Sequence, residues 1–151
     1  GGAAGIGTIT PTAKLHIAAG TATAGTAPLK LTSGTNLTTP EAGAVEFDGT
    51  NYFATASTTR YTVAKTLTNT ATLDFSSTAA GTTSDLTITV TGAADGDAVS
   101  LGVANASTVA NGSYTAFVSA TNTVTVRFTN SSLASPLDPA SGSFRASVIK
   151  Y

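Results

Sequence analysis

The chain has 151 residues, of which 10% are charged, and its formal net charge is −1. It contains no cysteine, which excludes disulfides and thiolate metal ligands. Its seven Lys and Arg residues are spread from Lys14 to Lys150 and form no basic patch for a phosphate backbone. No apolar run approaches the ~20 residues that span a bilayer. We therefore expect no nucleic-acid partner and no membrane insertion.

Threonine is the commonest residue, with 31 copies, and alanine follows with 27. Threonine is β-branched and fits a pleated sheet, where its hydroxyl can face water. The apolar i, i+3, i+4, i+7 spacing of an amphipathic helix is missing, while glycine and Asn-Gly turn signals recur throughout. This composition predicts an all-β protein.

The first half of the chain contains a short repeat. Leu15–Thr21 aligns without gaps on Leu29–Thr35, and a shortened third copy covers Val45–Thr50. Each copy has two apolar residues at period two and then a glycine, which predicts one short strand and a bend. Residues 1–65 hold only 13 large apolar residues, too few for a good core in a module of this size. Three chains around one axis could share these side chains, so we predict a trimeric β shaft over 1–65.

Residues 66–151 hold 22 large apolar residues in longer alternating runs. The clearest runs, Leu86–Thr91 and Thr123–Thr129, place aliphatic side chains on one face and threonines on the other. Further strands are predicted over 71–76, 98–103, 114–120 and 144–151, with turns at 80–81, 96–97, 111–112 and 121–122. The pattern predicts a small antiparallel β-sandwich, jelly-roll or immunoglobulin-like, over 66–151. Its predicted core is Leu86, Ile88, Val90, Val124, Val126 and Phe128.

Residues able to perform chemistry are few. His16 alternates with Leu15 and Ile17, so its side chain should point away from their face, and no Gly-x-Ser-x-Gly elbow accompanies it. At a trimer axis, three copies of this ring could hold a metal. Asp95-Gly96-Asp97 begins like a calcium loop, but it lacks the remaining ligands and is better explained as a turn.

Three carboxylates, Glu41, Glu46 and Asp48, could supply the paired acids of a glycosidase, and Glu46 and Asp48 share one strand face. There they would lie about 7 Å apart, a spacing compatible with an inverting glycosidase. No tryptophan platform for a sugar is present. We therefore expect no enzymatic activity, no cofactor and no metal.

Candidate binding residues lie in the second half. The segments 105–113 and 130–140 are polar and rich in turn residues, as is typical of exposed loops on a rigid scaffold. Asn105, Asn111 and Tyr114 are the predicted receptor-binding residues. Nearer the boundary between the halves, three aromatic residues could pack beneath the sandwich or contact a partner: Tyr52, Phe53 and Tyr61.

Several segments resemble a known family. Gly5–Thr8 followed by Pro11–Ile17 is similar to a segment of tail-fibre and head-fibre proteins of tailed bacteriophages, and Pro28–Gly34 and Pro40–Thr50 resemble the next segments of such fibres. The second half, from Leu73-Asp74-Phe75 to Val124-Thr125-Val126-Arg127, looks like a small β module at the ends of phage fibres. Similar segments also occur in bacterial surface proteins.

The resemblance implies a homotrimeric virion appendage on tail or capsid that attaches to a host surface, with a surface glycan as the expected ligand. Because the chain begins at Gly1, we expect an upstream region that docks on other virion proteins. Many such fibres carry a self-cleaving chaperone domain after the region matching Phe47–Thr50. Here a predicted sandwich comes next instead, so self-cleavage is not expected. The alternatives are a bacterial cell-surface or filament protein and a polysaccharide-degrading tailspike.

Overall fold

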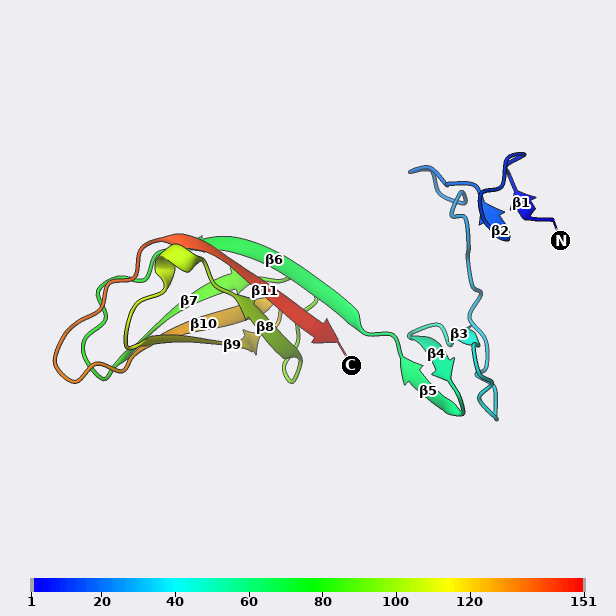
Figure 1. Cartoon of the computed structure of the whole chain (residues 1–151). Coiled ribbons are helices and arrows are strands. Elements are labelled where there is room, and N and C mark those ends of the chain that lie inside the picture. The colour runs from blue at the N-terminus through cyan, green and yellow to red at the C-terminus, as the bar shows by residue number, and fades with distance from the viewer. Residues whose placement is uncertain (1, 151) are drawn as a thin grey trace. The chain divides into compact units, whose positions relative to one another are not determined.

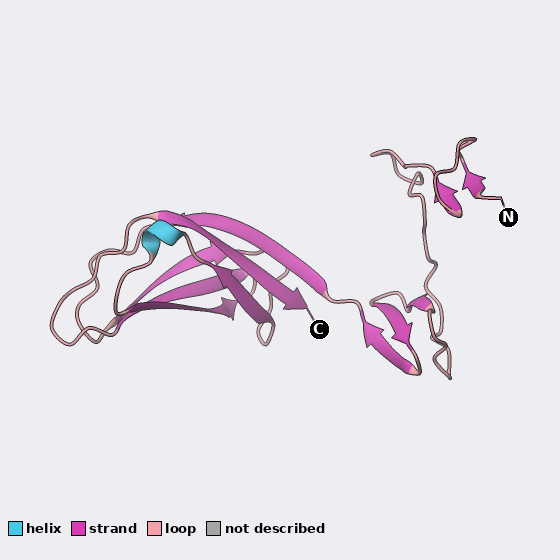
Figure 2. Ribbon diagram, viewed as in Figure 1, coloured by secondary structure: helices cyan, strands magenta, loops and turns pink. Residues whose placement is uncertain are grey.

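A computed structural model describes residues 2–150 of the chain (Figures 1 and 2). Within that range the chain forms eleven β-strands and one short 3₁₀ turn, which confirms the predicted all-β class. The chain divides into two compact units, Gly1–Val63 and Ala64–Tyr151. This division lies two residues before the boundary expected from the sequence.

The first unit begins with two very short strands. β1 (Ala4–Ile6) pairs in parallel with β2 (Leu15–Ile17). β2 is the first copy of the repeat, as predicted. The middle copy is a correction, because Leu29–Leu31 forms no strand. The two copies differ in their partner strands. β2 is hydrogen-bonded to β1, whereas within the described residues no strand pairs with Leu29–Leu31, so its backbone groups are left to water or to turns.

The third copy of the repeat belongs to a three-stranded antiparallel sheet in the order β3 (Val45–Phe47), β4 (Tyr52–Ala56) and β5 (Thr59–Thr62). β3 and β4 are joined through a turn in which the Asp48 Oδ1 atom accepts hydrogen bonds from the Thr50 and Asn51 amides, at 2.8 and 2.7 Å. β4 and β5 form a tight hairpin with Ser57 at φ 56°. Ser57 adopts the left-handed backbone that a two-residue hairpin turn demands.

The second unit consists of two open three-stranded antiparallel sheets. One has the order β7-β10-β9 and the other β6-β11-β8. The bounds of these strands are β6 Lys65–Leu73, β7 Thr83–Thr89, β8 Ala98–Gly102, β9 Gly112–Ala120, β10 Thr123–Asn130 and β11 Gly142–Lys150. The 3₁₀ turn, Asn105–Ser107, lies between β8 and β9. Figures 1 and 2 show the two sheets facing each other, and we call Ala64–Tyr151 the sandwich unit.

One hydrophobic core joins the two sheets. Ile88, Val90, Val124, Val126 and Phe128 are each less than 2% exposed, and Leu86 packs against them partly buried. The predicted core of the sandwich unit is therefore confirmed. The opposite sheet contributes further buried side chains from alternate positions, namely Leu73, Phe144, Ala146 and Val148.

The turns follow the predicted signals. Gly81, Gly96, Asn111 and Asn122 all have positive φ angles, between 62° and 86°. Asn122 also connects two turns, because its Oδ1 atom accepts a hydrogen bond from the Gly92 amide at 2.7 Å. Glycine and asparagine are favoured at such positions because they tolerate the left-handed conformation.

The outer faces of the sandwich unit are rich in hydroxyl groups. β10 turns Thr123, Thr125, Arg127 and Thr129 away from the core, while Val124, Val126 and Phe128 point into it. Arg127 forms a two-pronged ion pair with Asp85 on β7, at 2.8 and 2.7 Å. The exposed ring of Phe117 on β9, opposite Thr125, is the large apolar side chain on this face.

Candidate functional site

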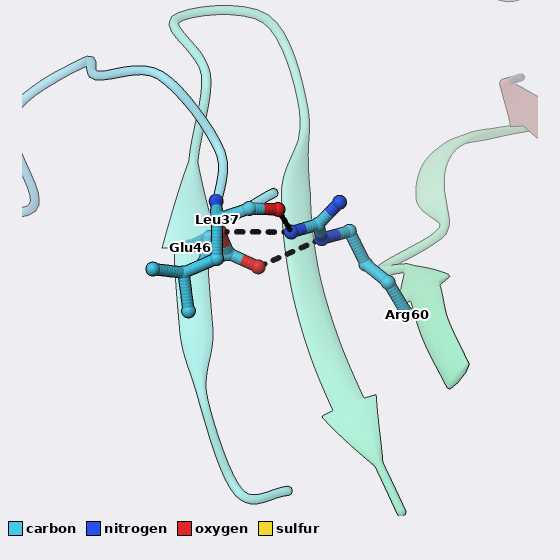
Figure 3. Close-up of polar contacts among 3 residues, drawn as sticks. All are labelled: Leu37, Glu46 and Arg60. Atoms are coloured by element: carbon cyan, nitrogen blue, oxygen red, sulfur yellow. Dashed lines mark hydrogen bonds and ion pairs between the residues drawn. The ribbon is translucent and has the colours of Figure 1, made fainter. Parts of the chain in front are cut away.

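A network of three residues organises the sheet of the first unit (Figure 3). Glu46 lies on β3 and Arg60 on β5, and the central strand β4 runs between them. The Arg60 Nε atom donates to Glu46 Oε2 at 2.7 Å, and its Nη2 atom donates to Glu46 Oε1 at 3.2 Å. Leu37 completes the network: its amide donates to Glu46 Oε1, and its carbonyl accepts from Arg60 Nη2, both at 2.6 Å.

The network fixes the ionised state of Glu46. The hydrogen bond from Arg60 and then the backbone amide of Leu37 hold the pKa of Glu46 below its ordinary value. The guanidinium also lies over the ring of Phe53 on β4, 5.9 Å from its centre. Charged hydrogen bonds of this kind are short and directional. The network therefore holds the segment around Leu37 on one face of the sheet.

The two faces of this sheet differ in character. Residues that are directly opposite in an antiparallel sheet point to the same side. The pairs Glu46↔Phe53 and Thr55↔Arg60 place the ion pair on one side. The pairs Val45↔Ala54↔Tyr61 and Phe47↔Tyr52 define the other. We call this second side the apolar face, made of Val45, Phe47, Tyr52, Ala54, Tyr61 and Val63.

Val63 continues β5 on this face, because its amide donates to the Tyr52 carbonyl at 2.8 Å. The rings of Phe47 and Tyr52 stack at 4.4 Å. Despite these contacts the face stays open: Val45 is 61% exposed, Tyr61 56% and Tyr52 44%. Tyr52 and Tyr61 thus lie exposed on the apolar face, whereas Phe53 lies on the other side beneath Arg60.

The first unit has no apolar core among its described residues. Within 2–63 the one buried residue is Thr55, which is 5% exposed, and no apolar side chain is buried. All twelve buried apolar side chains of the described chain lie between Leu73 and Val148. Conversely, nine large apolar side chains of the first unit are exposed: Ile6, Ile9, Leu15, Leu29, Leu37, Val45, Tyr52, Tyr61 and Val63.

A groove of about 360 Å³ lies beside the network, lined by residues 30–32, 34–37 and 45–47. Glu46 is its acidic residue, and both of its carboxylate oxygens are already hydrogen-bonded. The buried Oδ1 atom of Asn36 has no hydrogen-bond partner. Asp48, the second acid of the predicted pair, comes directly after β3 and accepts the amides of its own turn. The carboxylates of Glu46 and Asp48 therefore accept hydrogen bonds from backbone amides, and that of Glu46 also from Arg60.

The other candidate ligands also have structural partners. The Nδ1 atom of His16 accepts a hydrogen bond from the Thr12 amide at 3.2 Å. Asp97 accepts hydrogen bonds from the Ala94 amide and from Lys150 Nζ, both at 2.8 Å, as expected of a turn residue. Among the described residues, no group of three or more His, Cys, Asp or Glu side chains could hold a metal ion.

Two of the three predicted receptor-binding residues are exposed, and the third, Tyr114, is partly buried. Asn105 begins the 3₁₀ turn and is exposed, and Asn111, directly before β9, is exposed too. Tyr114 instead packs its ring against Phe75, Phe128 and Phe144, with ring centres 5.1 to 5.5 Å apart. Its hydroxyl donates to the Ser107 carbonyl at 2.9 Å, and burial raises its pKa. Its alternation with Ala116 and Val118 is a sequence signal of this inward position.

Two structural features, the Glu46–Arg60 ion pair and the buried side chain of Asn130, could not be predicted from the sequence. The Glu46–Arg60 pair is hidden because the hairpin between them turns at Ser57, which is not a usual turn signal. Asn130 lies in a segment predicted to be an exposed loop, yet it is fully buried, and its Nδ2 atom donates to the carbonyls of Thr78 and Ser135 at 2.8 and 2.9 Å. Its Oδ1 atom accepts from the Ser132 amide. Asn130 thus holds the loop after β10 against the core.

Comparison with known proteins finds no matching family model, no matching curated protein and no matching solved structure. None of the helices in the described part of the chain is long and apolar enough to cross a membrane. The function is therefore inferred from the residues and their geometry.

Proposed function

We propose that this chain is a structural subunit of a homotrimeric fibre, a virion appendage on a phage tail or capsid that attaches to a host surface. The observation that carries the proposal is the contrast between the units. The sandwich unit has a complete core, whereas the described part of the first unit buries no apolar side chain and exposes nine large ones. A unit of this kind gains its stability by packing against other chains.

The energetics favour assembly of the first unit. Full burial of a large apolar side chain contributes roughly 1.5–3 kcal/mol. Nine exposed side chains per copy therefore provide a driving force that a single chain leaves unused. Three copies around one axis would form a shaft, with the hydroxyl-rich segments on the outside. The Glu46–Arg60 network would then keep each copy's small sheet in shape before and after assembly.

In this proposal the sandwich unit is the knob of the fibre, of the jelly-roll or immunoglobulin-like kind. Asn105 and Asn111 are exposed on the connection between β8 and β9. We assign them the contact with a host surface glycan, and Tyr114 supports them from the core. Three weak contacts on one rigid trimer produce strong attachment through effective concentration. An upstream region of the protein would dock the shaft on other virion proteins.

The non-enzymatic character of the fibre is part of the proposal. A tailspike that cleaves polysaccharide needs two free acids flanking the sugar. Glu46 is bound to Arg60 and Leu37, and Asp48 is bound to its own turn. A bacterial surface protein built from the same modules would share the trimer and the knob. It would differ in the partner to which the upstream region docks.

The test has two parts. Negative-stain imaging of the purified chain should show a rod with a three-fold knob. Purified lipopolysaccharides and wall teichoic acids, immobilised on a surface, should then capture the chain. Asn105→Ala with Asn111→Gly should weaken this capture, because glycine keeps the left-handed backbone at 111. If the double variant were captured as well as the wild type, the assignment of Asn105 and Asn111 as binding residues would be wrong. Release of sugar from the polysaccharide would overturn the proposal that the chain is not an enzyme.

A further inference from the structure

We infer that the apolar face of the β3-β4-β5 sheet is the surface through which copies of this chain pack together. The inference rests on the proposed trimer and goes further, because it assigns one face of one sheet to the axis. The occupant of the face is the same face of the other copies. The opposite face, which carries Glu46 and Arg60, is then turned outward.

The register of the sheet makes this face continuous. Val45, Ala54 and Tyr61 form one row across the three strands, and Phe47, Tyr52 and Val63 form the next. The first row has one aromatic ring, Tyr61 on the edge strand, and the second has the stacked rings of Phe47 and Tyr52 beside Val63. Adjacent strands lie about 4.8 Å apart, so the six side chains form one patch.

Charge separates the two faces. Both charged residues of the three strands, Glu46 and Arg60, lie on the same side and neutralise each other there. The apolar face has no charged side chain. Copies of an uncharged face do not repel one another, and the face offers no charge to an ionic ligand. An interface core depleted of charge and enriched in aromatic residues is what stable protein interfaces show.

The sandwich unit offers little exposed apolar surface that could cover this patch. In the sandwich unit the apolar residues of both sheets already pack against one another, and the outer faces carry threonine, serine, the Arg127–Asp85 pair and the ring of Phe117 beneath Arg127. Within the described residues 64–150, the exposed large apolar side chains are Phe117 and Leu133. The apolar face of another copy of the chain offers the apolar surface that the sandwich unit does not.

The patch accounts for part of the surface that contacts between copies require. A fully buried aromatic side chain removes 150–250 Å² from water, so this half-exposed patch offers on the order of 300–400 Å² per copy. That is about half of the ~800 Å² that each partner contributes to a standard interface. The face is therefore the centre of the interface, and the other exposed apolar residues of the first unit supply the remainder, namely Ile6, Ile9, Leu15 and Leu29.

Two neighbouring residues of β5 supply a matched pair of variants. Tyr61 lies on the apolar face, while Thr62 is exposed on the face of the ion pair. Tyr61→Lys places an ammonium group at the interface of every copy, whereas Thr62→Lys adds the same charge to the same strand on the outside. We expect Tyr61→Lys to raise the concentration at which the assembly dissociates by at least about a hundredfold. Thr62→Lys should leave the mass at micromolar concentration unchanged.

A second measurement is independent of stability. The chain contains no cysteine, so a single Cys introduced at either position is the one reactive thiol. Incubation of Tyr61→Cys with a short bismaleimide should produce covalently joined chains, because the three side chains meet near the axis. Thr62→Cys should react with the reagent without joining chains. Circular dichroism of each variant reports whether the sandwich unit remains folded.

The outcomes separate the inference from the proposed function. If the wild-type chain and Tyr61→Lys are both trimers, and Tyr61→Cys gives no cross-linking, the proposed trimer is supported but the assigned face is wrong. If both lysine variants dissociate alike, the face is again not specific and the inference fails. If the wild-type chain is a monomer at every concentration, the proposed trimer itself fails.

Discussion

Arg60 and Glu46 are joined across the central strand of their sheet, with Arg60 Nε 2.7 Å from Glu46 Oε2. The bridge connects the two edge strands and holds the backbone of Leu37 between them. It is therefore the polar centre of a unit whose described residues have no apolar core.

Arg60→Leu should release the segment around Leu37. The substitution removes the donor to the Leu37 carbonyl and leaves the Glu46 carboxylate without its cation. We expect the Leu37 amide to exchange hydrogen faster in this variant, as measured by NMR or mass spectrometry. Arg127→Leu is the control, because it removes the ion pair with Asp85 in the sandwich unit. Unchanged exchange at Leu37 in Arg60→Leu would show that the network does not hold this segment.

The stability of the folded chain should decrease at acid pH, over a defined pH range. Hydrogen bonds from Arg60, Arg127 and Lys150 lower the pKa values of Glu46, Asp85 and Asp97, respectively. A carboxyl whose folded pKa is lowered contributes stability above its unfolded pKa, about 4, and loses it as the pH falls through the folded value. Melting temperatures should therefore be level from pH 7 to about pH 5 and decrease below about pH 4.

Asp97→Asn provides the comparison for this pH series. It should melt at a lower temperature than the wild type at pH 7, because Lys150 loses its charged partner. Its melting temperature should also depend less on pH. A wild-type chain that becomes more stable below pH 4 would contradict the assigned direction of these shifts.

The sandwich unit can be predicted from its sequence to a large extent, and the reason is visible in β7 and β10. Leu86, Ile88 and Val124 alternate with threonines, so hydropathy and β-propensity both indicate strands with one buried face. The start of β6 cannot be found in this way. The sequence predicts this strand over 71–76, yet it extends over Lys65–Leu73. Threonine and alanine occupy most of its positions, and both are found on either face of a sheet.

The first unit is harder to predict because its partners are not local. Leu29–Leu31 has the same pattern as Leu15–Ile17, but strand β1 pairs with the latter alone. Ala4-Gly5-Ile6 has no strand signal of its own. The apolar face is equally hidden, since Val45, Tyr52 and Tyr61 come together only through the register of the two hairpins. Spacing along a sequence does not determine such a register when the turn residues are unusual.

Val126→Asp should be strongly destabilising. The Val126 side chain is fully buried in the centre of β10, and a carboxylate there would have no cation or donor in the core. The expected loss is about 3–5 kcal/mol in the free energy of unfolding, measured by urea titration. Thr68→Asp is the matched control on the exposed side of β6 and should change stability by less than about 0.5 kcal/mol. Equal melting of Val126→Asp and the wild type would mean that the faces of β10 are reversed.

Asn130→Asp should also destabilise the sandwich unit. The change replaces an amide that donates to two carbonyls with a carboxylate that repels them. The expected cost is about 2–4 kcal/mol, with faster hydrogen exchange in the loop 131–137. Asn105→Asp, at an exposed position, should have little effect. Comparable stability of the two variants would show that the buried amide is not the anchor of this loop.

Sedimentation equilibrium of the full chain at micromolar concentration is the decisive measurement for the proposed trimer. A single chain has a mass of 14.8 kDa, and the proposed assembly predicts about 44 kDa, three times that value. The first unit leaves its large apolar side chains for other copies to bury, so the trimer should persist on dilution through the micromolar range. A compact, stable species of 14.8 kDa under the same conditions would contradict the proposed assembly.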